Sequence, residues 1–146
     1  MTNRPRRPWE KSYNGFSWSE RCTATPIQNA ALRAGLIIRP TVCSICLDAR
    51  SAHPQGRDYR FLHSEDYRLP LVFYPVCKPC HAAVHARFDN PDRWERILRA
   101  HGRIREWYVA LTMDPQSQWQ PFEVTYPAGL PPLVFNSLRC SAPTQR

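Results

Sequence analysis

The residues with the clearest chemical pattern are cysteines. Of the six in the chain, four form two CxxC pairs: Cys43 with Cys46, and Cys77 with Cys80. Two residues between thiolates let both sulfurs of a tight turn reach one ion, and two such turns complete a tetrahedron. Because soft, deprotonated sulfur ligands select zinc over magnesium or calcium, the pattern predicts one structural zinc ion. Cys22 and Cys140 have no such neighbour and are interpreted as small hydrophobic residues.

The cysteine pairs have three other interpretations. An iron–sulfur cluster also uses four cysteines and is an alternative. The string from Cys77 to His81 matches a haem-attachment motif, but covalent haem requires export, and the basic N-terminus lacks the apolar run of a secretory signal. His63 and Glu65 followed by a CxxC pair are similar to the zinc deaminase signature, yet too few residues separate its two halves.

A second group of metal-binding residue types lies within and just after the cysteine frame: His63, Asp66, His81 and His85. If the residues after the second cysteine pair are helical, His81 and His85 are four positions apart and share one face. A hairpin before that helix would deliver His63 or Asp66 to it. Two strands and a helix that converge with such side chains could hold a divalent cation for phosphodiester cleavage.

Capping signals predict the helix that precedes this frame. Thr25 is the expected N-cap, Pro26 stands at the first helical position, and Gln28 is the expected capping-box residue. Alanines at helical spacing follow, and Gly35 supplies the stop. Residues 36–38 are apolar and lead toward the first cysteine pair, which predicts a short strand.

Alternation and caps predict the remaining elements. Residues 59–63 and 71–76 read as the two strands of a hairpin. Residues 81–88 contain no helix breaker and should be helical. Asn90 and the following proline begin another helix, whose apolar spacing continues to residue 111 through a glycine. Either one kinked helix or two short ones result.

Length and charge indicate the class of protein and its partner. With 146 residues, the chain suffices for one domain with a modest core. The formal net charge is +8, and nearly all of the positive charge is arginine, whose rigid fork of donors matches phosphate. GC-rich codon usage is the alternative explanation of the arginine excess. We predict a nucleic-acid partner, DNA rather than RNA.

The predicted organisation has three parts. Residues 1–20 form a basic N-terminal arm whose aromatic residues either stack on bases or pack on the domain. Residues 21–114 form a zinc-binding α+β domain. Residues 115–146 are rich in proline without periodicity, which predicts an extended C-terminal tail that wraps the domain. No apolar run is long enough to cross a bilayer, so we expect a cytoplasmic protein whose thiols stay reduced.

Residues 43–88 resemble the HNH endonuclease family, especially its small zinc-stabilised members from phages and bacteria. The resemblance rests on three strings: CSIC, LHSEDYRLPL and CKPCHAAVH. It implies a zinc-pinned ββα unit in which His63 of the hairpin is the general base. His81 and His85 of the helix would then bind a catalytic metal. If the chain cleaves nucleic acid, this second divalent cation would be magnesium, manganese or nickel.

The hairpin departs from the family pattern at two points. His63 is followed by Ser64, whereas family hairpins commonly carry a His-His or Asp-His doublet. No asparagine lies between His63 and Cys77, where the family often has one, and Asp66 is the residue that could substitute as a ligand. We therefore predict a zinc-stabilised nucleic-acid-binding protein with an HNH-like core. An active HNH-type, metal-dependent endonuclease is the alternative.

Overall fold

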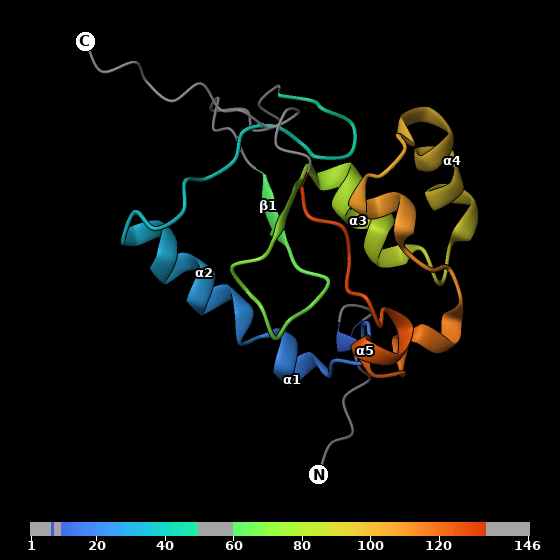
Figure 1. Ribbon diagram of the computed structural model, residues 1–146, viewed down its shortest axis with the longest axis horizontal. Helices are drawn as coiled ribbons and strands as arrows, with labels where there is room; N and C mark the ends of the chain where they lie inside the picture. Colours follow the sequence, from blue (N-terminus) through green and yellow to red (C-terminus); the bar gives the residue numbers. More distant parts are fainter. Residues whose placement is uncertain (1–6, 8–9, 50–59, 134–146) are drawn as a thin grey trace.

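The computed structural model describes residue 7, residues 10–49 and residues 60–133 (Figure 1). In chain order, its elements are α1 (Trp18–Arg21), α2 (Ala24–Arg33), β1 (Phe61–His63), β2 (Tyr74–Val76), α3 (Lys78–Ala86), α4 (Pro91–His101), the 3-10 helices η2 (Trp107–Ala110) and η3 (Pro115–Gln118), and α5 (Phe122–Thr125). Helices and one small sheet share a single core, so the predicted α+β class is confirmed.

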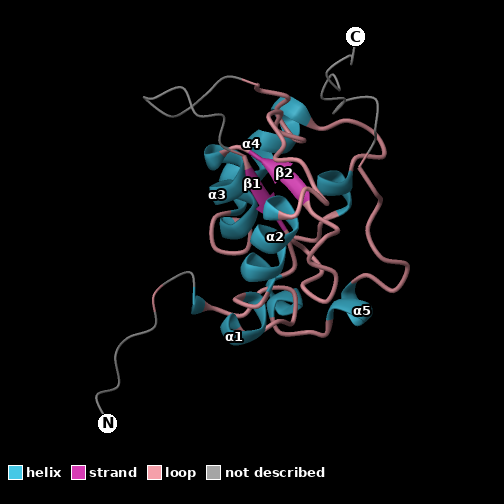
Figure 2. Ribbon diagram, turned by 90° about the vertical axis from the view of Figure 1, so that its left-hand side faces the viewer, coloured by secondary structure: helices cyan, strands magenta, loops and turns pink. Residues whose placement is uncertain are grey.

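The sheet is an antiparallel hairpin that leads directly into α3. Phe61 of β1 lies opposite Val76 of β2, and both strands fall within the predicted ranges but are shorter. α3 begins earlier than predicted, at Lys78, because Cys77 already occupies the N-cap position. The helix packs against both the hairpin and α4. Figure 2 shows the hairpin among the helices, with α1 and α5 at one end of the molecule.

α2 differs from its prediction at the N-terminus. The helix begins at Ala24, before the predicted cap at Thr25, and its N-cap residue makes no side-chain capping bond. Gln28 is not a capping-box residue. Its buried amide instead donates hydrogen bonds to Ser64 Oγ at 3.1 Å and Pro70 O at 2.9 Å. Tertiary hydrogen bonds to the segment between the strands thus replaced the local cap.

Two other predicted elements are settled by the structure. The strand predicted at residues 36–38 is wrong, because these residues pair with no strand in the described part of the chain and Leu36 is 75% exposed. Asn90 caps α4 as predicted and accepts a hydrogen bond from Arg93 N at 3.2 Å. α4 ends before Gly102 and η2 follows separately, so the two-helix alternative holds. Within the described residues, no helix is long and apolar enough to span a membrane.

The core includes both ends of the described chain. Trp94 and Trp107 are fully buried, and the ring of Trp107 stacks on Tyr74 with centroids 4.0 Å apart. Aromatic residues from the predicted arm and tail join the same core: Tyr13, Phe16, Phe122 and Tyr126. Of the aromatic residues described in residues 1–20, Tyr13 and Phe16 therefore pack on the domain, whereas Trp18 is exposed. The predicted extended tail instead contains η3 and α5 before residue 126.

Gly15 shows how tightly the N-terminal segment docks. Its φ is +82°, and its N–H donates a hydrogen bond to Gln118 O at 3.0 Å. A Cβ at this position would overlap the backbone carbonyl of Gln120. Only glycine combines this left-handed conformation with so close an approach of two backbones.

We expect Gly15→Ala to lower the free energy of unfolding more than Gly35→Ala does. Both glycines have positive φ, at +82° and +72°, so each substitution costs about 1–2 kcal/mol for the backbone conformation alone. Only at Gly15 would the added Cβ also meet backbone atoms, whereas nothing lies within 4 Å at Gly35. Chemical denaturation of the two variants measures the difference. Equal destabilisation would contradict the docking.

Candidate metal centres

The first cysteine pair lies in a turn that is fastened to the hairpin. Ser44, between Cys43 and Cys46, donates its backbone N–H to Pro75 O of β2 at 2.7 Å. Its hydroxyl accepts a hydrogen bond from Trp107 Nε1 at 3.1 Å. The turn is therefore held from two sides by segments that are distant in the sequence.

The second pair meets the first at the start of α3. Cys77 is the N-cap residue of the helix and Cys80 lies in its first turn. The four sulfur atoms all lie within 4.8 Å of one another, and Cys46 Sγ is 3.7 Å from Cys77 Sγ. Cys43, Cys77 and Cys80 are buried. The four predicted cysteines thus come together in a cluster that could hold a metal ion such as zinc.

The pKa values of the clustered thiols indicate that they cannot all be deprotonated without a cation between them. Hydrogen bonds from Cys77 and Cys80 lower the pKa of Cys43, so its sulfur ionises before theirs. The hydrogen bond to Cys43 raises the pKa of Cys77 to about 12, because the thiol that donates to an anion retains its proton. All four sulfurs can be thiolates together only around a positive ion, and zinc binds sulfur as thiolate. The donor set therefore fits zinc.

The second cluster consists of the three histidines that the sequence indicated. His63 lies at the end of β1, and His81 and His85 lie four positions apart on α3. One ring nitrogen of each lies within 4.8 Å of the others, and the Nε2 atoms of His81 and His85 are 3.0 Å apart. Asp66 does not join them, because its carboxylate pairs with Arg68 at 2.8 Å.

Both histidines of α3 are suited to bind a cation. Burial, followed by the neighbouring charges of His63 and Arg21, lowers the pKa of His81 to about 3. Burial and the charge of His63 also lower the pKa of His85. The two rings are therefore neutral near pH 7 and keep a lone pair, which is the form that ligates metals.

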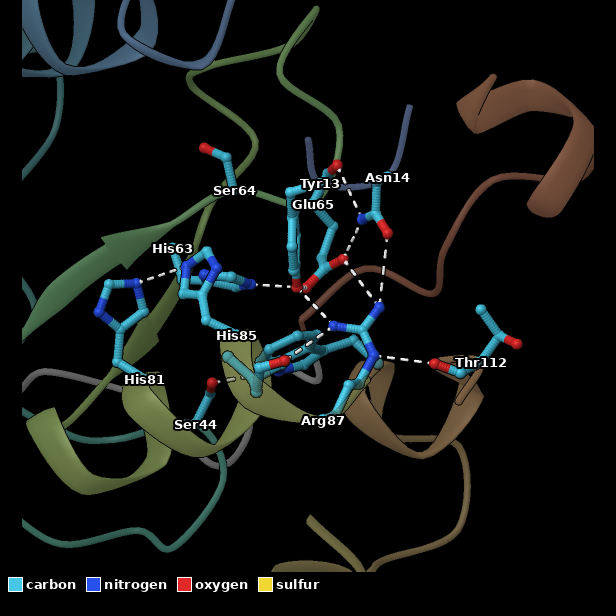
Figure 3. A network of polar contacts seen from close by, with 12 residues as sticks. Tyr13, Asn14, Ser44, His63, Ser64, Glu65, His81, His85, Arg87 and Thr112 are labelled. Atoms are coloured by element: carbon cyan, nitrogen blue, oxygen red, sulfur yellow. Dashed lines mark hydrogen bonds and ion pairs between the residues drawn. The ribbon is translucent and has the colours of Figure 1, made fainter. Parts of the chain in front are cut away.

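A buried carboxylate orients His63. Glu65 Oε1 lies 2.6 Å from His63 Nε2, and both side chains are fully buried (Figure 3). A carboxylate only accepts hydrogen bonds, so a His63 ring that binds a metal in the neutral form would carry its proton on Nε2. Its Nδ1 is buried and has no hydrogen-bond partner. This nitrogen is the atom that remains for a metal, in the carboxylate–histidine arrangement typical of metal ligands.

Glu65 is held ionised by residues from the N-terminal segment and from the end of α3. Tyr13 OH donates to Glu65 Oε1 at 2.6 Å, and Asn14 Nδ2 donates to Glu65 Oε2 (Figure 3). Arg87 Nη2 lies 3.8 Å from the same carboxylate. Burial alone would raise the pKa of Glu65, but the charges of Arg87 and His63 and the hydrogen bonds from His63 and Tyr13 lower it to about 2.

Sequence reasoning missed this supporting shell. Glu65 stands two residues after His63, and a carboxylate so close to a candidate ligand is the one signal that could have identified it. Tyr13 and Asn14 are about fifty positions from Glu65 along the chain, and no local pattern links them to it. No sequence pattern distinguishes Arg87, whose side chain is fully buried.

The histidines open into a cavity of about 270 Å³. Three arginines contribute to its lining: Arg21, Arg39 and Arg60. A site with imidazole donors and guanidinium groups around one cavity can combine a cation with a phosphate group.

Comparison with known proteins gives no match to a family model, a curated protein or a solved structure. The resemblance to HNH endonucleases therefore stays a prediction that rests on the sequence strings.

We expect Cys46→Ser to abolish metal binding at the cysteine cluster and Cys22→Ser to leave it unchanged. Cys22 is exposed and lies outside the cluster, which makes it a matched control. Loss of one thiolate should also lower the free energy of unfolding by several kcal/mol, given the roughly 10–16 kcal/mol that structural zinc contributes in zinc-finger peptides. Thiolate-to-cobalt charge transfer in the Co²⁺-loaded protein reports on sulfur ligation and not on the histidine cluster. An undiminished band in Cys46→Ser would contradict the assignment.

Proposed function

We propose that this chain is a zinc-stabilised, DNA-binding protein with an HNH-like core. The observation that carries the proposal is the cluster of His63, His81 and His85 at an arginine-lined cavity. The net charge of +8 supports a polyanionic partner. The order β1, β2, α3, with two histidines on the helix and one on the hairpin, supports the resemblance to the HNH family.

In this proposal the three histidines bind a divalent cation that faces the nucleic-acid backbone. His63 contributes Nδ1, because Glu65 engages Nε2. This pairing favours a ligand role for His63 over the general-base role that the resemblance implies, since the side chain is fully buried. Ser64 follows His63 where family hairpins carry the second member of a doublet. It is not placed to act as a general base, because it is buried and accepts a hydrogen bond from Gln28.

Metal-dependent hydrolysis of phosphodiesters is the second candidate function. Three protein ligands, rather than four, are typical of metal sites that keep a position open for substrate or water. A magnesium, manganese or nickel ion would supply charge stabilisation to the phosphoryl oxygens when bound. Arg21 and Arg39, which line the cavity, can orient the phosphate.

A nicking assay on supercoiled plasmid and on circular single-stranded DNA separates the two functions. We expect the protein to bind DNA with an affinity that falls as salt rises, because phosphate contacts release counterions. If it also hydrolyses DNA, nicking with magnesium, manganese or nickel should disappear in His81→Ala/His85→Ala. His101→Ala is the matched control, because His101 lies on α4 outside the cluster.

The outcomes of the binding and nicking measurements distinguish DNA binding, hydrolysis at the histidines and neither function. Salt-sensitive binding without nicking supports the binding function and removes the second candidate. Nicking that persists in the double variant contradicts the histidine site. Absence of DNA binding overturns the proposed function.

We expect Glu65→Gln to weaken divalent-metal binding at the histidines by about 10–100-fold, the usual effect of losing a carboxylate that orients a ligand. Tyr13→Phe removes one hydrogen bond to Glu65 and should give a smaller loss with less disturbance of the core. Competition with a chelator measures the affinity, and nitrogen NMR of His63 reports the proton on Nε2. Glu123→Gln, at an exposed carboxylate, is the control and should match the wild type. An unchanged affinity in both Glu65→Gln and Tyr13→Phe would contradict the orienting role.

A further inference from the structure

A second cavity, of about 470 Å³, adjoins the first at the histidines. The two cavities share five lining residues: Trp18, Arg21, Phe61, His81 and His85. The histidine cluster is therefore not at the end of a blind pocket. It lies where two separate spaces meet, with α1 contributing to the wall of both.

The second cavity combines ammonium groups with aromatic rings. The only two lysines of the chain, Lys11 and Lys78, both line it. Lys11 forms an exposed ion pair with Asp89 at 3.2 Å, and such a pair is weak enough for a phosphate to replace it. Trp18 is 38% exposed and lines both cavities.

Arg21 brings positive charge to the junction itself. Its guanidinium lies over the rings of Trp18 and Tyr13, at 5.4 and 5.3 Å from their centroids, and its Nη1 donates to Lys11 O at 2.8 Å. These contacts hold the group on the wall shared by the two cavities. A phosphate beside the histidines would therefore meet a positioned guanidinium, with further cations on either side.

We propose that an unpaired, single strand of nucleic acid crosses this junction, with one nucleotide in each cavity and the phosphate between them at the histidines. This inference rests on the proposed function and names its substrate class. The second cavity has the size of a small-molecule pocket and the first is slightly smaller, so each has room for at most one nucleotide and not for a base-paired duplex. Charged groups that follow a backbone and an aromatic ring that stacks a base are the usual means of holding single strands.

The proposal makes Trp18 a base-stacking residue and Lys78 a phosphate contact. Lys78 lies in the second cavity only, whereas Trp18 lies on the wall of both. A strand held on both sides of the histidines presents an internal phosphate to them and not a terminal one. The site would therefore act within a strand.

Fluorescence anisotropy with a labelled DNA oligonucleotide, single-stranded or annealed to its complement, tests the path. Calcium in place of a cleavage-supporting metal keeps the DNA intact. We expect the single strand to bind at least about tenfold more tightly than the duplex. Trp18→Ala should weaken single-strand binding by about 5- to 100-fold. Trp18→Phe keeps an aromatic ring and should retain most of the wild-type affinity. Lys78→Gln should reduce the magnitude of the salt slope by about 0.7.

Two matched controls keep the test specific. Trp119→Ala removes a tryptophan that is 63% exposed and lines neither cavity, and Arg99→Gln removes an exposed cation of α4. Both should bind single strands like the wild type. Equal binding of duplex and single strand, or an unchanged affinity in Trp18→Ala, would overturn the strand path while salt-sensitive DNA binding left the proposed function standing. Failure to bind either DNA would overturn both.

Discussion

Four sulfur atoms within 4.8 Å of one another impose the constraint on which the described fold depends. Thiolates so close together repel, and only a cation at their centre lets all four exist at once. The ion would join two segments 31 positions apart, measured from Cys46 to Cys77. Between them stands a hairpin with strands of three residues, which is marginal in water without further support. Closure of the chain around that hairpin by a bound ion would supply stability that its short strands lack.

A buried ion pair provides a second, polar attachment. Glu65 and Arg87 are both fully buried, and removal of either would leave the other charge uncompensated. Tyr13 and Asn14 contact both members of this pair. The N-terminal segment therefore packs where its polar groups satisfy the buried charges. That position also brings Trp18, at the start of α1, to the wall of the two cavities.

Short-range sequence patterns predicted the features that neighbouring residues determine. The CxxC spacing identified the sulfur cluster, and Asn90 before a proline identified the start of α4. Gln28 misled the prediction, because the same amide that can cap a helix instead satisfies a loop from another part of the chain. The three histidines were predicted as a group from a helical spacing and a hairpin, both of which are short-range patterns.

The rest of the site depends on contacts that no short-range pattern contains. Tyr13 and Gly15 belong to a segment that reads as a basic arm, and their burial follows from docking against Glu65 and the chain near Gln118. Burial of a titratable group against a partner about fifty or more residues away leaves no periodic trace in the sequence. Only three-dimensional packing reveals that Glu65 and Arg87 support the histidines.

α3 carries residues of both clusters, which links their geometries. Cys80 and His81 are adjacent, and consecutive residues of a helix point about 100° apart, so one helix directs sulfur to one cluster and imidazole to the other. Four protein ligands close a metal site, whereas three leave a position open. A bound ion at the sulfur cluster could therefore fix the helix, whereas an ion at the histidine cluster would keep a position open. Because α3 is a single rigid element, coordination at Cys77 and Cys80 sets where His81 and His85 meet His63.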